Sequence, residues 1–275
     1  MPELPDVEGF KKYLDATALH KTIKSIEVEN DFVLKGMDVE KFKKVLTGDR
    51  FSSSKRHGKF LFIDLMKNGY LVLHFGMTGS LNYYKNPEEQ KEHERVIFEF
   101  ENGYRLGYDN QRMLGQVRVV EDLDQFIKKQ NLGPDVLDDS FDYQRFREVM
   151  NGRRGLLKTA LMNQSILSGI GNEYSDEILF QLQLHPKTRI DDLNDEHYKV
   201  LFRTIKDTLA KAIERQHSPT GLPDHFLLSH RNKGEKCPRC GHQIETVSVS
   251  GRTAYYCPAC QAEHHIKVQN VGSSS

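Results

Sequence analysis

Four cysteines near the C-terminal end have the spacing of a metal site. They form two C-x-x-C pairs separated by sixteen residues, and they are the only cysteines of the chain: Cys237, Cys240, Cys257 and Cys260. Two such pairs offer four thiolates, which Zn²⁺ binds as a tetrahedron, and the separation matches that of a zinc ribbon. Two disulfides or a redox-active dithiol pair are the alternatives, which an oxidising compartment would favour. The spacing predicts one structural Zn²⁺.

The beginning of the chain, MPELPDVEGF, places a secondary amine beside a carboxyl group. Removal of Met1 would free the nitrogen of Pro2, and Glu3 follows directly. An α-amino group has a pKa of about 7.7–8.0, so a useful fraction is neutral and nucleophilic near physiological pH. The adjacent carboxyl group could donate or accept protons. The residues alone leave open whether this is a reactive centre or an ordinary beginning.

Two further stretches suit contact with phosphate groups. In KRHGKF, Lys59 follows a glycine at the start of an apolar strand, where it is either a functional amine or a solvated strand end. In LSGIGNEY, Gly169 and Gly171 permit a tight turn, and Asn172 stands where it can cap the following helix. Because the first N–H groups of a helix can hold an anion, this corner is either a phosphate-binding turn or an ordinary helix–helix connection.

Two glycine-containing loops carry apolar side chains where exposure is expected. HFGMTGSL sets Met77 in a loop after a buried strand, and a methionine there suits a contact surface better than a core. DNQRMLG sets Arg112 beside Met113 and Leu114. An arginine with apolar neighbours on a loop can enter a stack of bases, so this loop indicates contact with DNA.

Composition restricts the class of protein. The 275 residues are 37% apolar and 28% charged, which suits a globular chain of one to three domains. A formal net charge of zero argues mildly against a nucleic-acid partner, because phosphate contacts require Lys and Arg. The charges are nevertheless segregated, with basic stretches such as SSSKRHGKF, and this pattern is compatible with one cationic groove. No apolar run approaches the roughly 20 residues of a membrane span and no secretory signal is found, so we expect a cytoplasmic protein.

The N-terminal half is rich in predicted strands. Asn68-Gly69 and Asn102-Gly103 each separate two apolar runs, and Asn-Gly is the preferred pair of a two-residue type I′ hairpin turn. A further strand is expected over residues 21–30, after a helix over residues 6–19. The apolar stripe of this helix is formed by Val7, Phe10, Tyr13 and Leu14.

Behind Gly133-Pro134 the pattern becomes helical, and Ser140 is the expected N-cap of the first helix. The helices are expected over residues 140–150, 155–164, 172–182 and 194–215. The last has an apolar stripe formed by Tyr198, Leu201, Ile205, Leu209 and Ala212. Residues 245–257 predict two strands with Gly251-Arg252 at the bend, and the tail over 271–275 is expected to be disordered.

Together these motifs resemble the formamidopyrimidine-DNA glycosylase/endonuclease VIII (Fpg/Nei, MutM-like) family of base-excision repair enzymes. The resemblance rests on PELPDVE, the GK of KRHGKF, HFGMTGSL, LGPDVL, LLKTALMNQ, GIGNEYSDEILF, LHP and CPRC…GRT…CPAC, which occur in the family's order and cover nearly the whole chain. It implies an α+β multidomain fold with an N-terminal β-sandwich, a helix–two-turns–helix (H2TH) domain and a C-terminal zinc-ribbon β-hairpin, and a DNA cleft between the two halves. The implied boundaries are 1–131 for the catalytic sandwich, 132–230 for the H2TH domain, 231–270 for the zinc finger and 271–275 for the tail.

The resemblance implies a reactive centre at the N-terminus. Pro2, freed by removal of Met1, would be the nucleophile, and the other implied catalytic residues are Glu3, Lys59 and Arg252. The amine would attack C1′ of a damaged nucleotide and form an iminium, or Schiff base. Glu3 would protonate the ring oxygen of the sugar, after which β-elimination and δ-elimination would cut the strand. A retained Met1 would hold the Pro2 nitrogen in an amide and abolish the activity.

The resemblance also implies a set of residues that bind DNA. Met77, Arg112 and Leu114 would fill the gap that an everted base leaves in the duplex. Asn172 would hold a phosphate. The implied DNA-binding residues are His74, Met77, His93, Arg112, Leu114, Lys158 and Asn172. The implied partner is double-stranded DNA with damaged bases or abasic sites, bound by a monomer that associates with the nucleoid and has no membrane contact.

Three departures from the family pattern bear on the substrate. Asp6 stands where glutamate is common, and Leu114 stands where members directed at 8-oxoguanine present an aromatic residue. The linker over residues 219–236 is short where those members carry a lid over the flipped purine. We therefore expect weak activity on 8-oxoguanine and better activity on ring-opened formamidopyrimidines, oxidised pyrimidines or abasic sites.

Two other functions fit parts of the sequence. A non-catalytic binder of damaged or abasic DNA would keep the cleft and the finger without turnover, but Pro2, Glu3 and Lys59 are all present. A zinc-ribbon RNA-binding or transcription accessory protein would explain the cysteines and leave the N-terminal motif unexplained. A bifunctional DNA glycosylase and abasic-site (AP) lyase accounts for all of these features.

Overall fold

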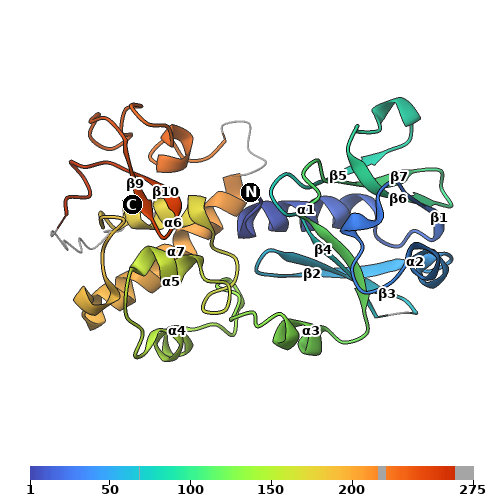
Figure 1. Ribbon diagram of the computed structural model, residues 1–275, viewed down its shortest axis with the longest axis horizontal. Helices are drawn as coiled ribbons and strands as arrows, with labels where there is room; N and C mark the ends of the chain where they lie inside the picture. Colours follow the sequence, from blue (N-terminus) through green and yellow to red (C-terminus); the bar gives the residue numbers. More distant parts are fainter. Residues whose placement is uncertain (68, 216–220, 264–275) are drawn as a thin grey trace. The chain divides into compact units, whose positions relative to one another are not determined.

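The computed structural model describes residues 1–67, 69–215 and 221–263. The chain forms two compact units, residues 1–131 and 132–275. Their helices and strands are labelled in Figure 1. Among the described residues, no helix is both long and apolar enough to span a membrane. Asn68 of the first expected hairpin turn, Pro219 at the start of the expected short linker, and the tail over 271–275 lie outside the described residues.

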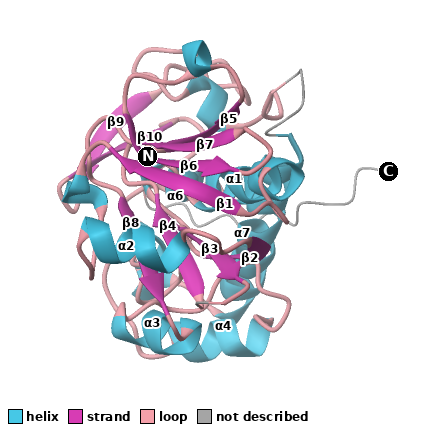
Figure 2. Cartoon of the chain, turned by 90° about the vertical axis from the view of Figure 1, so that its right-hand side faces the viewer, coloured by secondary structure: helices cyan, strands magenta, loops and turns pink. Residues whose placement is uncertain are grey.

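The first unit is a sandwich of two four-stranded antiparallel sheets, which Figure 2 shows as separate layers. The first sheet has the spatial order β1 (Ile23–Val28), β6 (Glu94–Phe100), β7 (Arg105–Asp109) and β5 (Ser80–Tyr84). The second has the order β2 (Phe51–His57), β3 (Phe60–Leu65), β4 (Tyr70–His74) and β8 (Gln116–Val120). The predicted N-terminal β-sandwich is confirmed, and the expected strand over 21–30 is β1.

Alternating side chains of the strands build the core of this unit. In β3, Leu61 and Ile63 belong to the large core cluster that contains residues of both sheets. Phe62, between them, packs with Phe126 of α3 (Leu123–Lys129) on the opposite face of the sheet. Successive residues of a strand point to opposite faces, so a continuous apolar run fits a sheet that is covered on both sides.

Two helices complete the first unit. α1 (Leu4–Thr17) packs against β2, β3 and β5, and the predicted stripe is confirmed, because Val7 and Leu14 are fully buried while Phe10 and Tyr13 pack against the same core. α2 (Val39–Leu46) lies against β1. Short 3-10 helices are η1 (Asp31–Val33) and η2 (Pro87–Glu89).

The turn predicted at Asn102-Gly103 is wrong in type. Residue 100 pairs with Tyr104, so the hairpin loop contains three residues, 101–103, with Gly103 at a φ of 79°. The N–H of Gly103 donates to the carbonyl of Phe100, which is the type I turn followed by a left-handed residue that three-residue loops adopt. Cross-strand pairing, rather than the local Asn-Gly pair, sets the loop length. The other predicted hairpin, between β3 and β4, is present, but its predicted two-residue turn at Asn68-Gly69 is also wrong. The N–H of Leu65 donates to the carbonyl of Gly69, where φ is 77°, so this loop too is longer than two residues.

The second unit contains the predicted helices, and Figure 1 shows α6 among them beside α7 and β10. The helices are α4 (Tyr143–Met150), α5 (Leu157–Met162), α6 (Asn172–Gln181) and α7 (Asp195–Arg215), with the 3-10 helices η3 (Ile190–Asp192) and η4 (Leu227–His230). The predicted stripe of α7 is confirmed, because all five of its residues are buried. Ser140 is not the N-cap of α4. The carboxylate of Asp142 accepts the N–H of Arg145 at 2.9 Å, while the hydroxyl of Ser140 bonds Asp138.

A two-stranded hairpin, β9 (Glu245–Val249) and β10 (Arg252–Tyr256), lies close to the end of the described chain. Its turn is Ser250-Gly251, with φ values of 49° and 75°, because Val249 pairs with Arg252. The bend predicted at Gly251-Arg252 is therefore one residue too late. Arg252 is the first strand residue beyond the turn, and two positive φ values are those of a type I′ turn.

Candidate functional site

The N-terminal pair predicted to be reactive lies at the beginning of α1. Glu3 precedes the helix and is buried, and its backbone N–H donates to the carboxylate of Asp6 at 2.8 Å. The next two residues, Leu4 and Pro5, are also buried. Asp6, noted above as a departure from the family pattern, therefore fixes the backbone of Glu3, so the residue after Pro2 is held firmly while Met1 stays exposed.

Lys59 and His74 meet at one end of the second sheet. Lys59 occupies the two-residue turn between β2 and β3, in which Gly58 has a φ of 56°, and its side chain is buried. Phe60 pairs across the sheet with His74, and their rings are 4.8 Å apart. Burial, together with the positive charge of Lys59, lowers the pKa of His74 to about 4. The imidazole is therefore neutral near pH 7. Its Nδ1 accepts the N–H of Gly76 at 3.4 Å, which leaves Nε2 as the protonated nitrogen.

The three side chains predicted to fill a gap in DNA lie on two adjoining loops. Met77 and Leu114 are 41% and 51% exposed, which is unusual for large apolar side chains, and Arg112 is exposed as well. The N–H of Arg112 donates to the hydroxyl of Thr78 at 3.3 Å, which joins the loops. Met113, between Arg112 and Leu114, has a φ of 52° and packs against the core. The structure thus brings these predicted residues together.

His93 lies directly before β6, and its carbonyl accepts the N–H of Asn110 at 2.9 Å. Asn110 begins the loop that contains Arg112 and Leu114. The structure therefore connects His93 to this loop through the backbone.

In the second unit, Asn172 is the first residue of α6 rather than its cap, which is Gly171. The side-chain amide of Asn172 donates to the carbonyl of Thr253 at 3.0 Å, while its buried Oδ1 has no hydrogen-bond partner among the described residues. Thr253 follows Arg252 in β10, so the predicted phosphate-binding asparagine and the finger arginine come together. The hairpin tip is also held to α5 by the hydroxyls of Ser250 and Thr159, which are 2.8 Å apart.

Lys158, predicted to bind DNA, is fully buried in α5. Its ammonium group donates to the carboxylate of Asp176 at 2.7 Å, the hydroxyl of Ser175 at 2.6 Å and the carbonyl of Asn172 at 3.1 Å. The contact with Asn172 places this charge behind the predicted phosphate-binding residue. Lys158 therefore supports the beginning of α6, and its side chain is not exposed for contact with DNA.

Asp176, which the sequence reasoning missed, connects three segments of the second unit. Besides Lys158, its carboxylate accepts two hydrogen bonds from Arg231, at 2.8 and 2.9 Å, and the N–H of Tyr255 in β10 at 3.2 Å. Two adjacent acids in the otherwise apolar helix sequence SDEILF were the available signal. Buried acids require partners, but the sequence does not show which distant residues supply them.

The four cysteines meet as predicted. Their sulfur atoms all lie within 4.8 Å of one another, with 3.9 Å between Cys237 and Cys260 and 3.5 Å between Cys240 and Cys257. Tetrahedral Zn²⁺ with bonds of about 2.3 Å requires sulfur separations of about 3.8 Å, so the donor set fits this ion. A disulfide needs about 2.05 Å, and all four residues are free cysteines. Cys237 and Cys257 also pack against Phe180 of α6, which joins the metal centre to the helices.

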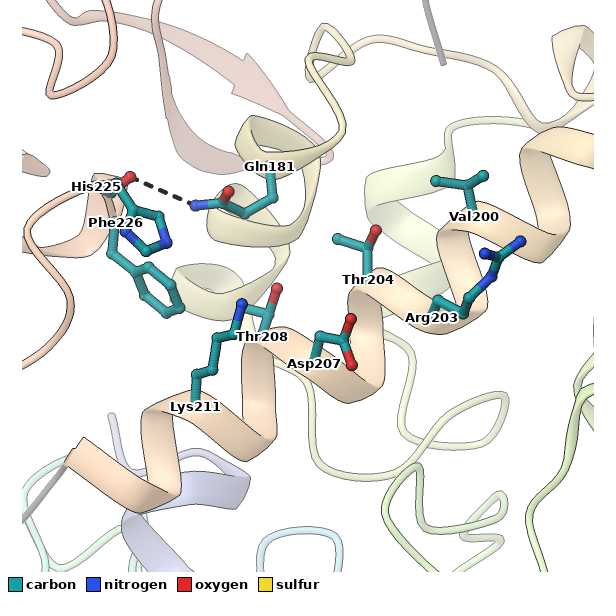
Figure 3. A pocket seen from close by; sticks show the side chains of 9 residues that line it. All are labelled: Gln181, Val200, Arg203, Thr204, Asp207, Thr208, Lys211, His225 and Phe226. Atoms are coloured by element: carbon teal, nitrogen blue, oxygen red, sulfur yellow. Dashed lines mark hydrogen bonds between the residues drawn. The ribbon is translucent and has the colours of Figure 1, made fainter. Parts of the chain in front are cut away.

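A pocket in the second unit lies apart from these groups. It is formed by α6, α7 and residues before η4, and Figure 3 shows its lining: Gln181, Val200, Arg203, Thr204, Asp207, Thr208, Lys211, His225 and Phe226. Gln181 donates to the carbonyl of His225 at 3.5 Å, the dashed line in the figure. Burial and the positive charges of Lys211 and Arg239 lower the pKa of His225. None of the predicted site residues lines this pocket.

Comparison with known proteins assigns the chain to a family. Residues 1–117 match the formamidopyrimidine-DNA glycosylase N-terminal domain, residues 132–223 match the H2TH domain of the same enzymes, and residues 234–262 match the zinc finger found in FPG and IleRS. The formamidopyrimidine-DNA glycosylase of Oceanobacillus iheyensis is 36% identical over 95% of this chain and 98% of its own length. The chain belongs to the formamidopyrimidine-DNA glycosylase family. It is a DNA glycosylase of DNA repair, and its zinc finger places four cysteines where they can hold one zinc ion.

Solved structures of the family have the same fold. Lactococcus lactis Fpg in complex with DNA that contains an abasic site gives a TM-score of 0.84 at 28% identity, covering 95% of this chain and all of that one. The same enzyme with DNA that contains FAPY-dG gives 0.85, with the same identity and coverage. The H2TH and zinc-finger portions of the second unit, and the sandwich of the first, are thus features of the family.

Proposed function

We propose that this enzyme is a bifunctional DNA glycosylase and AP lyase whose nucleophile is the amine of Pro2 after removal of Met1. The observation that carries the proposal is the position of Pro2, next to a buried Glu3 whose backbone Asp6 holds at the start of α1. A proline at this point offers a secondary amine without the need to desolvate a lysine, because an α-amino group titrates near pH 8.

The proposed reaction begins when the lone pair of the Pro2 nitrogen attacks C1′ of the damaged nucleotide. The bond from C1′ to the base breaks, and the base departs with that electron pair and a proton. Glu3 protonates O4′, the sugar ring opens, and an iminium forms between Pro2 and C1′. Loss of a C2′ proton then expels the 3′ phosphate. A second elimination expels the 5′ phosphate, and hydrolysis of the iminium returns the amine.

The other predicted residues would hold the DNA while this occurs. Neutral His74 can donate a hydrogen bond from Nε2, and Lys59 beside it supplies a positive charge for a phosphate. In the second unit, Asn172 and Arg252 would bind phosphates, and Lys158 would support Asn172 from within. Zn²⁺ would be structural, since it holds the strand that carries Arg252. Met77, Arg112 and Leu114 would fill the gap left by the everted base.

A matched pair of proteins tests the nucleophile. One carries a removable N-terminal extension that ends immediately before Pro2, and the other is the same protein after cleavage, verified by intact mass. Only the cleaved form should be linked covalently to an oligonucleotide with an abasic site upon borohydride reduction, while both bind it. Trapping of the extended form, or failure of the cleaved and zinc-loaded form, contradicts the proposal. Glu3→Gln should lower base excision by about 100-fold or more, the usual contribution of a general acid.

We further propose that 8-oxoguanine is a poor substrate and that formamidopyrimidines, oxidised pyrimidines and abasic sites are better ones. The support lies in the linker after α7. Phe226 and Leu227 are buried. The N–H of Leu228 donates to Glu177, and Arg231 binds Asp176. The linker from residue 226 onward therefore packs against α6. Only residues 216–225 are left for a lid over a flipped purine. Excision rates on duplexes that each contain a single lesion decide this, and rapid removal of 8-oxoguanine opposite cytosine would refute it.

We also propose that the functional domains are 1–131, 132–230 and 231–270, and that the enzyme acts as a monomer on DNA in the cytoplasm. The family matches fall inside these three ranges.

A further inference from the structure

Asn110 is a fully buried polar residue between the two loops that carry Met77 and Leu114. Its side-chain amide donates to the carbonyl of Phe75 and to the hydroxyl of Tyr108, both at 3.0 Å. Its Oδ1 accepts the N–H of Gly115 at 3.4 Å. The side chain of Asn110 is therefore hydrogen-bonded to the beginning of the Met77 loop, residues 75–79, and to the end of the Leu114 loop, residues 110–115.

Tyr108 extends this connection. Its hydroxyl donates to the carbonyl of His74 at 2.6 Å, and its ring is buried in the core. The hydroxyl thus accepts from Asn110 and donates to the residue at the end of β4. Buried polar groups that are fully bonded fix one arrangement of the segments they join.

Three glycines lie next to this network at positions where any side chain would overlap with it or with the other loop. A Cβ at Gly115 would lie 1.9 Å from the hydroxyl oxygen of Tyr108 and 2.2 Å from Nδ2 of Asn110. A Cβ at Gly79 would lie 2.8 Å from the same nitrogen, and one at Gly76, where φ is 60°, would lie 2.6 Å from the backbone of Gly115. The backbones of both loops are packed directly on the Asn110 amide and on each other.

We propose that Asn110 is the positioning residue that sets the two loops in register for insertion into DNA, with Tyr108 as its support and Thr78 as a second link. The inference rests on the proposed function, in which Met77, Arg112 and Leu114 fill one gap. Three side chains from two loops can enter the same gap only when the loops keep a fixed separation. Asn110 itself is buried and touches no DNA, so it acts through the loops.

The experiment compares Asn110→Ala and Thr78→Val with Asn102→Ala. Asn102 is an exposed asparagine in the β6–β7 turn of the same sheet, and its side-chain oxygen accepts the local N–H of Tyr104. Excision of a lesion from duplex DNA should fall about 10- to 100-fold in Asn110→Ala, because a misplacement of about 1 Å costs up to that factor, and several-fold in Thr78→Val. Cleavage of an abasic site in single-stranded DNA, where no base must be everted, should stay within twofold of the unchanged protein. Asn102→Ala should match the unchanged protein in both assays.

A second measurement does not depend on turnover. With a stable tetrahydrofuran abasic analogue opposite or beside 2-aminopurine, insertion should unstack the fluorescent base and raise its emission. Asn110→Ala and Thr78→Val should lose most of this rise at saturating protein.

Duplex excision and fluorescence within twofold of the unchanged protein for both variants would overturn the proposal, as would an equal loss on single-stranded DNA. If Asn110→Ala does not fold, Thr78→Val, whose side chain is exposed, decides in the same way. If the unchanged protein neither cuts nor traps DNA, the proposed function fails, and the fluorescence comparison still decides the role of Asn110.

Discussion

Replacement of Asp176 by alanine should destabilise the second unit far more than the same replacement of Asp195. Both carboxylates form ion pairs of nearly equal length, 2.7 Å from Asp176 to Lys158 and 2.8 Å from Asp195 to Arg147. The side chains of Asp176 and Lys158 are fully buried, whereas that of Asp195 is 81% exposed. The two pairs thus have nearly the same length, and they differ in burial and in the number of partners that the carboxylate binds.

The magnitude follows from what each change leaves behind. Without Asp176, the ammonium group of Lys158 stays buried without its carboxylate. Arg231 loses the oxygen that accepts both of its hydrogen bonds, and the N–H of Tyr255 loses an acceptor. Breaking one partner of a buried ion pair costs about 3–5 kcal/mol. An exposed pair contributes about 0–1 kcal/mol, to which the position of Asp195 at the beginning of α7 adds about 0.3–1 kcal/mol.

The assay is thermal and urea unfolding of the zinc-loaded protein, followed by release of Zn²⁺ to a chromogenic chelator. Release reports on the second unit, because Asp176 binds the strand next to the metal centre. We expect Asp176→Ala to lower the transition temperature by about 10 °C or more and Asp195→Ala by less than about 6 °C, from a few degrees per kcal/mol in a unit of this size. The double variant with Lys158→Met should recover part of the loss, because it removes the unpaired buried charge. Equal losses below about 1 kcal/mol for both single variants would refute the reasoning, since burial would then have no effect.

Three further predictions concern the metal and the titrating groups. Removal of Zn²⁺ by a chelator, or Cys240→Ser, should lower DNA affinity at least tenfold and leave the first unit folded, as circular dichroism and DNA-binding titrations can check. The pKa of His74 is lowered to about 4 by burial and by Lys59, so between about pH 6.5 and 4 the unfolded chain holds a proton that the folded chain does not. Stability should therefore fall by up to about 3 kcal/mol as the pH drops through this window, and His74→Gln should abolish the fall. Burial raises the pKa of Glu177 to about 7, so the folded chain keeps a proton that the unfolded chain loses above about pH 4.5. The contribution of Glu177 to the free energy of unfolding should then be lost as the pH rises from about 4.5 to 7. Relative to the unchanged protein, Glu177→Gln should therefore be more stable at pH 8 than at pH 5 in urea unfolding. The opposite ranking would contradict this prediction.

Periodicity in the sequence predicted the regular elements well, because burial of one face is a local property of a helix or strand. The stripes of α1 and α7 are buried as expected, and the sandwich strands follow the apolar runs. Turn and cap details were less accurate. The loop at Asn102-Gly103 is one residue longer than predicted, because the pairing between β6 and β7 sets its length. Asn172 was expected to cap α6, but its side chain binds the carbonyl of Thr253.

In the candidate site, too, some features could be predicted from the sequence and others could not. Spacing of the cysteines predicted the metal centre, since both knuckles are local and need only one hairpin to meet. The exposed loop residues Met77 and Leu114 could also be anticipated, because glycines surround them. The positions of Asn110 and Asp176 could not, since neither residue type in isolation reveals which carbonyl or cation it will meet.

The sequence by itself determined which chemical groups this protein carries: a proline at position 2 with a neighbouring carboxyl group, four cysteine thiols in ribbon spacing, and glycine loops that expose apolar side chains. Tertiary structure decided how these groups are held. Lys158, for which the family resemblance implied a DNA contact, is buried against an acid 18 residues away, and that acid also binds an arginine 55 residues further on. The physical reason is that desolvation and hydrogen bonding depend on atoms from distant segments, so the partner of a buried charge or amide is fixed only when those segments pack together.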